Sequence, residues 1–210
     1  MANPPARSND GRRPAAAGIR AAPRRAGVRG CVETRAFAEA PVGASPGPTP
    51  FGAELDAGGR YILSQGNIGP NRAAVPDGST AASLTFTSAG AANVITGAAP
   101  TTETAACWVQ VTPDGRHAYT TNTGSGTITG FAIGTDGMLT RLTADGRTGV
   151  TGTGTQPLDM AYADGYLYAV TAGDGGIHGF HVESDGSLTP LATGSVAGAL
   201  PVSVTGLAAF

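Results

Sequence analysis

Apolar and polar residues alternate over short stretches in the middle of the chain. Such alternation is typical of strands with one buried face. Between residues 108 and 142 it predicts four strands: Trp108–Val111, His117–Thr121, Thr127–Ile133 and Met138–Leu142. Asp114-Gly115 and Asp136-Gly137 lie between strands and suit tight hairpin turns, because glycine adopts positive φ without strain. The pattern therefore predicts a four-stranded antiparallel sheet.

This unit recurs along the chain. Phe131 and Phe180 lie 49 residues apart, as do Asp136 and Asp185, whereas Asp114 and Asp164 lie 50 apart. A looser copy starts at Pro50, and a fourth begins near Val204. Repeats of about 40–50 residues with strand patterning are typical of β-propeller blades. We therefore expect an all-β fold with about three four-stranded antiparallel blades, at about residues 48–100, 101–150 and 151–200, and the start of a further strand at 201–210.

The number of units is too small for a closed ring, because β-propellers have about four to eight blades. The sequence thus predicts an incomplete propeller, and we interpret it as a fragment. A repeat array needs something to cap its ends. Open blade edges are therefore expected to favour self-association.

The composition agrees with many short strands joined by turns. The chain has 33 glycines and 15 prolines among 210 residues, which argues against a helical bundle. No apolar run approaches the about 18 residues that span a bilayer, so we expect no membrane contact. No signal-peptide core follows the early arginines, and we take the cytoplasm as the default compartment. Two cysteines, Cys31 and Cys107, do not make a disulfide framework.

Charge is distributed unevenly. Before residue 43 there are eight arginines and three acidic residues, a formal charge of +5, and the remainder carries five arginines and twelve acidic residues, or −7. Residues 1–47 are rich in Arg, Ala and Pro and have too few large apolar residues to form a core, so we expect a disordered tail. A nucleic-acid-binding arm or a transit peptide are the alternatives. The lack of interleaved aromatic residues and the prolines argue against both.

Three strings resemble a known family, namely Pro113-Asp114-Gly115-Arg116, Thr121-Asn122-Thr123-Gly124-Ser125-Gly126-Thr127-Ile128 and Asp136-Gly137-Met138-Leu139-Thr140. They are similar to sequences of the lactonase family of seven-bladed β-propellers, which includes 6-phosphogluconolactonases and carboxymuconate-lactonizing enzymes. The resemblance covers about residues 48–210 and places them in the C-terminal half of such a propeller. It implies at most a hydrolase of a sugar or phosphosugar lactone, such as 6-phosphogluconolactone. Whether this segment is an enzyme stays open, since fold does not imply function.

Hydrolysis of a cyclic ester needs a base to activate water and a donor to stabilise the oxyanion. A phosphorylated substrate also needs a basic side chain for its phosphate. In a blade, the loop between the second and third strands and the loop to the next blade share one end, the mouth, opposite the Asp-Gly turns. Arg60 and Arg116 lie next to those turns and are poor candidates. The mouth-side candidates are Glu103, Asp145 and Asp159 as the base and Arg72, Asn122 and Arg147 for substrate binding.

One departure from the family weakens the enzymatic hypothesis. Family members often carry a histidine after the proline that opens the innermost strand, whereas Phe51, Cys107 and Leu158 stand at those positions here. The alternative is a non-catalytic propeller segment that serves as a binding or structural module, or an inactive gene fragment. We expect no cofactor and no nucleic acid partner.

Two further motifs have structural explanations. His178 and His181 are three apart on a predicted strand and face opposite sides, so they do not share a metal ion, and we expect no metal site. We expect Trp108 to pack in the core of its blade rather than to stack at the channel mouth.

Overall fold

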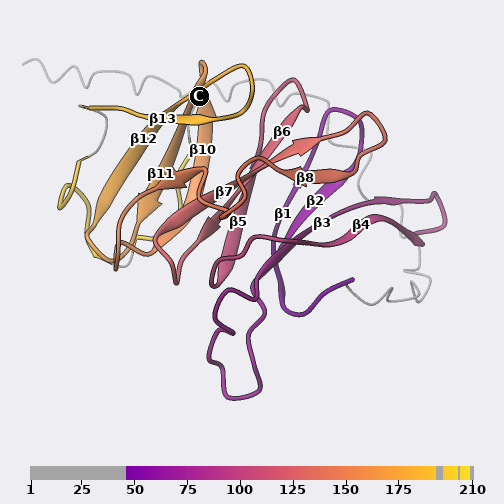
Figure 1. The fold of residues 1–210 in the computed structure, drawn as a ribbon, viewed down its shortest axis with the longest axis horizontal. Helices are drawn as coiled ribbons and strands as arrows, with labels where there is room; N and C mark the ends of the chain where they lie inside the picture. The colour runs from indigo at the N-terminus through magenta and orange to yellow at the C-terminus, as the bar shows by residue number, and fades with distance from the viewer. Residues whose placement is uncertain (1–45, 193–195, 203, 209–210) are drawn as a thin grey trace, which may run out of the picture. The chain divides into compact units, whose positions relative to one another are not determined.

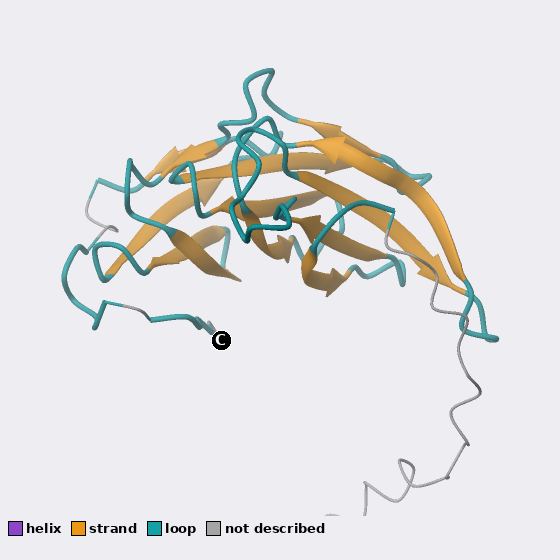
Figure 2. Ribbon diagram, turned by 90° about the horizontal axis from the view of Figure 1, so that it is seen from below, coloured by secondary structure: helices purple, strands orange, loops and turns teal. Residues whose placement is uncertain are grey.

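The computed structural model describes residues 46–192, 196–202 and 204–208. The chain divides into two units, Met1–Ala38 and Glu39–Phe210, and the first lies wholly outside the described residues. The tail predicted for residues 1–47 therefore falls outside them up to residue 45. Every regular element in the described part is a strand, as Figure 2 shows, and no helix there is suited to crossing a membrane.

The strands form three antiparallel sheets in which neighbours along the chain pair (Figure 1). Sheet 1 contains β1 (Pro50–Leu55), β2 (Tyr61–Gln65), β3 (Thr80–Phe86) and β4 (Ala92–Pro100). Sheet 2 contains β5 (Ala106–Val111), β6 (His117–Asn122), β7 (Thr127–Ile133) and β8 (Leu139–Arg141), while β9 (Gly149–Val150) pairs with the other end of β7. Sheet 3 contains β10 (Pro157–Ala163), β11 (Tyr166–Thr171), β12 (Gly176–Val182) and β13 (Leu188–Pro190). The prediction of three four-stranded antiparallel units is confirmed.

The predicted hairpin turns have the expected backbone. Gly115, Gly137 and Gly186 have φ values of 68°, 86° and 86°, which residues with a Cβ rarely adopt. In the first of these turns, the Asp114 carboxylate accepts a hydrogen bond from the backbone N–H of Arg116 at 3.0 Å. An Asp before the glycine thus closes the turn with its own side chain.

The hydrophobic core lies between the sheets. One buried cluster joins sheets 1 and 2, and its members are Ile62, Ala81, Ala99, Val109, Val111, Ala118, Phe131, Ile133 and Leu139. A second joins sheets 2 and 3, with Tyr119, Ile128, Met160, Leu167, Ala169, Phe180 and Leu188. Each sheet is therefore stabilised mainly by burying apolar side chains against its neighbours.

Trp108 corrects one expectation. It is half-buried and belongs to neither buried cluster, and its ring lies edge-on to Phe51 of sheet 1 with centroids 5.1 Å apart. The adjacent residue Val109 takes the core position instead. The reason is a break in the strand register between Ala106 and Val109, which changes the side to which the intervening residues point.

The first strand of each sheet has the same irregularity, and β5 lies between β1 and β10. The pairing register shifts between Pro50 and Ala53, between Ala106 and Val109, and between Pro157 and Met160. The residue before each strand, namely Thr49, Ala105 and Gln156, has a positive φ of 52°, 58° and 55°. Non-glycine residues seldom adopt this conformation. Tertiary contacts must therefore stabilise it at the start of the first strand in each of the three sheets.

Hydroxyl groups bridge these irregular segments from one sheet to the next. Thr121 accepts a hydrogen bond from the N–H of Trp108 at 3.0 Å and donates to the carbonyl of Leu158 at 2.9 Å. Ser64 makes the matching bonds, from the N–H of Gly52 and to the carbonyl of Cys107. Each bridge satisfies two backbone groups that the strand ladder leaves unpaired.

The Thr121→Val variant tests this bridge, since valine keeps the shape and removes the hydroxyl. Two backbone groups then lose their partner, and we expect the free energy of unfolding to fall by about 1–3 kcal/mol. The measurement is chemical denaturation followed by circular dichroism. Thr140→Val is the matched control, because Thr140 is exposed and its stability change should be small. Equal losses in the two variants would contradict the bridge.

The further strand predicted within residues 201–210 is not formed by the described residues of that range. The Val204 N–H donates to the carbonyl of Pro201 at 3.3 Å within a local turn, and the Leu207 N–H donates to the Asp159 carboxylate of β10 at 3.0 Å. A local turn and a bond to a side chain do not make a strand ladder, which needs backbone–backbone hydrogen bonds to a neighbouring strand.

Candidate functional site

Three of the six candidate residues come together at the mouth end of sheets 1 and 2. Glu103 lies in the connection from β4 to β5, and its carboxylate is buried, with 1% of the residue exposed. Arg147 lies in the loop between β8 and β9, and its Nε donates to Oε1 of Glu103 at 2.7 Å. The Arg147 side chain remains 58% exposed. The pair therefore joins a fixed, buried anion to a guanidinium whose outer edge faces solvent.

Asp145 lies beside this pair. Its carboxylate accepts a hydrogen bond from the backbone N–H of Arg147 at 3.0 Å, and this bond is the main cause of an Asp145 pKa below its usual value. The hydrogen bond and the charge of Glu103 raise the pKa of Arg147 above its ordinary value. Both residues are thus charged at neutral pH.

Close packing holds the β8–β9 loop against the β4–β5 connection. The Thr102 hydroxyl donates to the carbonyl of Asp145 at 2.8 Å. Gly146 has a φ of 79°, and a Cβ at this position would overlap the carbonyl oxygen of Thr101. Only glycine meets both conditions without strain, so the contact between the two segments depends on Gly146.

Further polar groups that the sequence did not single out adjoin the pair. The loop between β2 and β3 brings Asp77, whose backbone N–H donates to the Thr104 hydroxyl at 3.0 Å and whose charge acts on Arg147. Ser125 accepts a hydrogen bond from the N–H of Thr104 at 2.9 Å. The polar run Thr101–Thr104 between two predicted blades is the sequence signal that points to this end. We call Asp77, Glu103, Thr104, Asp145 and Arg147 the mouth cluster.

Asn122 lies behind this cluster rather than on its surface. It is fully buried at the end of β6, and its amide nitrogen donates to Thr127 and Thr129 at 3.1 and 2.8 Å. The Thr129 hydroxyl in turn donates to the carbonyl of Gly146 at 2.7 Å. Through this chain of hydrogen bonds, Asn122 supports the loop that carries Arg147.

The two other candidates lie apart from the cluster. Asp159, in β10, is half-buried, and its carboxylate accepts hydrogen bonds from the N–H groups of Met160 and Leu207. Arg72 is exposed in the β2–β3 loop with a φ of 62°. Neither has a hydrogen bond or ion pair with the mouth cluster among the described residues. The structure therefore brings Glu103, Asp145 and Arg147 together, and not Asp159 or Arg72.

The residues excluded from the mouth lie at the turns, as expected. Arg60 donates from Nε to Asp56 at 2.6 Å and from Nη1 to the carbonyl of Gly134 at 3.2 Å. Its guanidinium thus joins the β1–β2 turn of sheet 1 to the β7–β8 turn of sheet 2. Arg116 is exposed at the β5–β6 turn.

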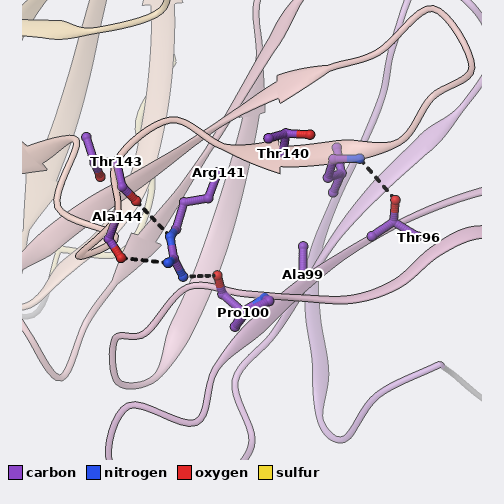
Figure 3. A pocket seen from close by; sticks show the side chains of 8 residues that line it. Thr96, Ala99, Pro100, Thr140, Arg141, Thr143 and Ala144 are labelled. Atoms are coloured by element: carbon purple, nitrogen blue, oxygen red, sulfur yellow. Dashed lines mark hydrogen bonds between the residues drawn. The ribbon is translucent and has the colours of Figure 1, made fainter.

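A separate pocket of about 570 Å³ lies between β4 and β8 (Figure 3). Arg141 borders it and donates to the carbonyls of Pro100, Thr143 and Ala144 at 2.8, 2.8 and 2.6 Å. None of the candidate residues lines this pocket. The Arg141 side chain therefore links the backbone at the end of β4 in sheet 1 to the backbone that follows β8 in sheet 2.

The histidines of sheet 3 contact different carboxylates. His178 lies 3.3 Å from Asp174, and His181 lies 3.0 Å from Glu183. Within residues 46–192, 196–202 and 204–208, no three His, Cys, Asp or Glu side chains gather as metal ligands would.

No family model matches the chain, and no curated protein matches it. Solved structures do resemble it. A proposed 6-phosphogluconolactonase from Bacteroides uniformis has a TM-score of 0.56 and 16% sequence identity, over 73% of this chain and 42% of that one. The periplasmic gluconolactonase of Pseudomonas aeruginosa has a TM-score of 0.54 and 17% identity, over 71% of this chain and 43% of that one.

The fold is a lactonase-like β-propeller fold. Sheets 1, 2 and 3 are its blades. The chain spans less than half the length of these two solved structures. At such low identity the likeness concerns the fold alone, and function has to be argued from the mouth cluster.

Proposed function

We propose that this propeller segment binds a sugar lactone at the mouth cluster and hydrolyses it. The observation that supports this most is the Arg147–Glu103 pair: the buried carboxylate fixes Nε and leaves the outer N–H groups of the guanidinium directed at solvent, beside the ionised Asp145. A fixed cationic donor next to a carboxylate is the minimum set for ester hydrolysis.

Each group has a defined role in the reaction. The outer N–H groups of Arg147 donate to the lactone carbonyl oxygen, which becomes negative as water attacks. Asp145 accepts a proton from that water. A bond forms between the water oxygen and the carbonyl carbon, the ring C–O bond breaks, and the ring oxygen takes up the proton that Asp145 had accepted, which returns Asp145 to its carboxylate form. The product is the open-chain hydroxy acid.

The charge of the site favours a neutral sugar lactone over a phosphorylated one. Three carboxylates, Asp77, Glu103 and Asp145, act on the single guanidinium of Arg147. A phosphate would be repelled by more charges than attract it. Carboxylates accept hydrogen bonds from sugar hydroxyls, so the same groups suit an uncharged polyol ring.

The experiment compares hydrolysis of glucono-1,5-lactone and 6-phosphogluconolactone with the spontaneous rate, by proton release at constant pH. We expect Arg147→Ala to reduce turnover of the neutral lactone about 10²-fold through loss of the oxyanion donor. Asp145→Asn, which removes the base, should reduce it by about 10² as well. Arg116→Ala, an exposed arginine at the opposite end, is the matched control. The hypothesis fails if the wild-type chain does not exceed the spontaneous rate, or if Arg147→Ala retains full turnover.

A non-catalytic binding module is the second candidate function. Two observations favour it. The segments of β1, β5 and β10 in which the register shifts contain no histidine. In addition, the lowered pKa of Asp145 makes its carboxylate a weak base. Calorimetric titration with gluconate, the open-chain product, separates the two functions. Binding that Arg147→Ala abolishes, without any turnover, supports the module.

A further inference from the structure

Each sheet has two faces that differ in what they contact. We call the face turned toward the preceding sheet in the chain the leading face and the opposite face the trailing face. In sheet 2 the leading face includes Val111, Ala118 and Ile133, which are buried against the trailing face of sheet 1. In sheet 3 the leading face includes Leu167 and Phe180, which are buried against Tyr119 and Ile128 of the trailing face of sheet 2.

The leading face of sheet 1 is apolar, and its outer part is exposed, whereas Leu84 on the same face is buried. Leu55 pairs with Tyr61 across β1 and β2, as Val111 pairs with Ala118 in sheet 2, so the residues at these positions correspond. Phe86 corresponds in the same way to Ile133, because each is the last residue of the third strand. The sheet 1 side chains Leu55, Tyr61, Phe86 and Val94 are exposed, and Phe86 is 52% exposed. Four large apolar residues on one sheet face mark an interaction surface.

A hydroxyl group completes each of the two contacts that the chain makes between its sheets. Ser83 of sheet 1 donates to the carbonyl of Gly137, in the β7–β8 turn of sheet 2, at 2.7 Å. Tyr119 of sheet 2 donates to the carbonyl of Gly186, in the β12–β13 turn of sheet 3, at 2.8 Å. In both contacts, a trailing-face hydroxyl bonds to the glycine of the outer turn of the next sheet.

Sheet 1 and sheet 3 each have one of the two groups that make this contact: sheet 1 has the turn glycine, and sheet 3 has the hydroxyl. Gly90 occupies the equivalent turn of sheet 1, with a φ of 83°, and has open space where Gly137 and Gly186 are closely packed. Tyr168 pairs with Gly179 in sheet 3 as Tyr119 pairs with Gly130 in sheet 2, so it holds the hydroxyl position of the trailing face. Its hydroxyl makes no hydrogen bond within the described residues.

The trailing face of sheet 3 has the composition that such a contact needs. Tyr166 lies against Tyr168 and His181, with ring centroids 6.4 and 5.3 Å apart. Ile177 corresponds to Ile128, which is buried in the contact between sheets 2 and 3. Aromatic residues with a polar group at one end are typical of interface cores.

We propose that the leading face of sheet 1 binds the trailing face of sheet 3 of a second copy of this chain. The contact repeats the geometry of the two contacts within the chain, with Tyr168 of one copy donating to the Gly90 carbonyl of the other. Such an interface is heterologous, since it joins two different surfaces, so it either closes a ring or extends further.

Sedimentation of the full 210-residue chain over a range of concentrations is the first test. We expect the mass to rise from 20.7 kDa to twice that value or a higher multiple. Phe86→Glu and Tyr168→Glu should each raise the dissociation constant about tenfold or more, because each places a charge in the interface core. Met138→Glu is the matched control, as Met138 is exposed on the outer turn of sheet 2.

Mixing the variants tests the direction of the contact. Phe86→Glu and Tyr168→Glu each keep one intact face, so an equimolar mixture should associate more strongly than either variant alone. Circular dichroism of each variant checks that it is folded. A mass of 20.7 kDa at every concentration overturns the proposal, since the leading face then does not bind a second copy. Undiminished association of Tyr168→Glu alone also overturns it, since two leading faces would then be in contact.

Discussion

Replacing Phe131 with alanine is expected to lower the free energy of unfolding by about 3–5 kcal/mol. Phe131 is 1% exposed in β7 and belongs to the cluster between sheets 1 and 2. Its truncation removes apolar area from that cluster and leaves a cavity that the surrounding strands fill only in part. The measurement is urea denaturation at a fixed protein concentration, followed by far-ultraviolet circular dichroism.

Phe51→Ala is the control for this variant. It makes the same chemical truncation, but Phe51 is 55% exposed and contacts the edge of Trp108. Losing that ring contact should cost about 0.5–1.5 kcal/mol. If the two variants lose the same free energy of unfolding, the buried cluster between sheets 1 and 2 does not contribute the large stabilisation expected of it.

The strands could be predicted because local signals coincide. In sheet 2, alternation selects Thr127–Ile133 to the residue, and the Asp-Gly pairs mark the β5–β6 and β7–β8 turns. The start of β5 is different: it begins at Ala106, two residues before the predicted Trp108. Ala106 pairs with Asn122 across a register shift, and a period-two pattern contains no information about such a shift.

The sequence could predict which candidate residues lie at the same end of adjacent sheets, because topology alone determines those positions. Glu103 and Arg147 are 44 residues apart in sequence, yet both lie in connections at the same end of adjacent sheets, so blade geometry alone places them near each other. The orientation of a side chain is a different matter. Asn122 points into the protein toward Thr127 and Thr129, and Asp159 satisfies nearby N–H groups, because buried backbone and hydroxyl groups need partners.

Gly146→Ala is expected to lower the free energy of unfolding by about 2–4 kcal/mol, from a left-handed backbone and from overpacking together. Gly154→Ala separates these two causes. Gly146 and Gly154 have φ values of 79° and 78°, but a Cβ at Gly154 meets open space. The control should therefore lose only the backbone contribution, about 1–2 kcal/mol. Thermal or urea unfolding of the two variants in parallel gives the difference.

The same substitution acts on the mouth cluster without touching a charged side chain. A methyl group at Gly146 pushes the β8–β9 loop away from the Thr101 carbonyl, and Arg147 moves with it from Glu103. Any lactone hydrolysis should then fall as it does in Arg147→Ala, whereas Gly154→Ala should retain it. If Gly146→Ala matches Gly154→Ala in both stability and turnover, the close approach of the two connections does not hold the Arg147–Glu103 pair in place.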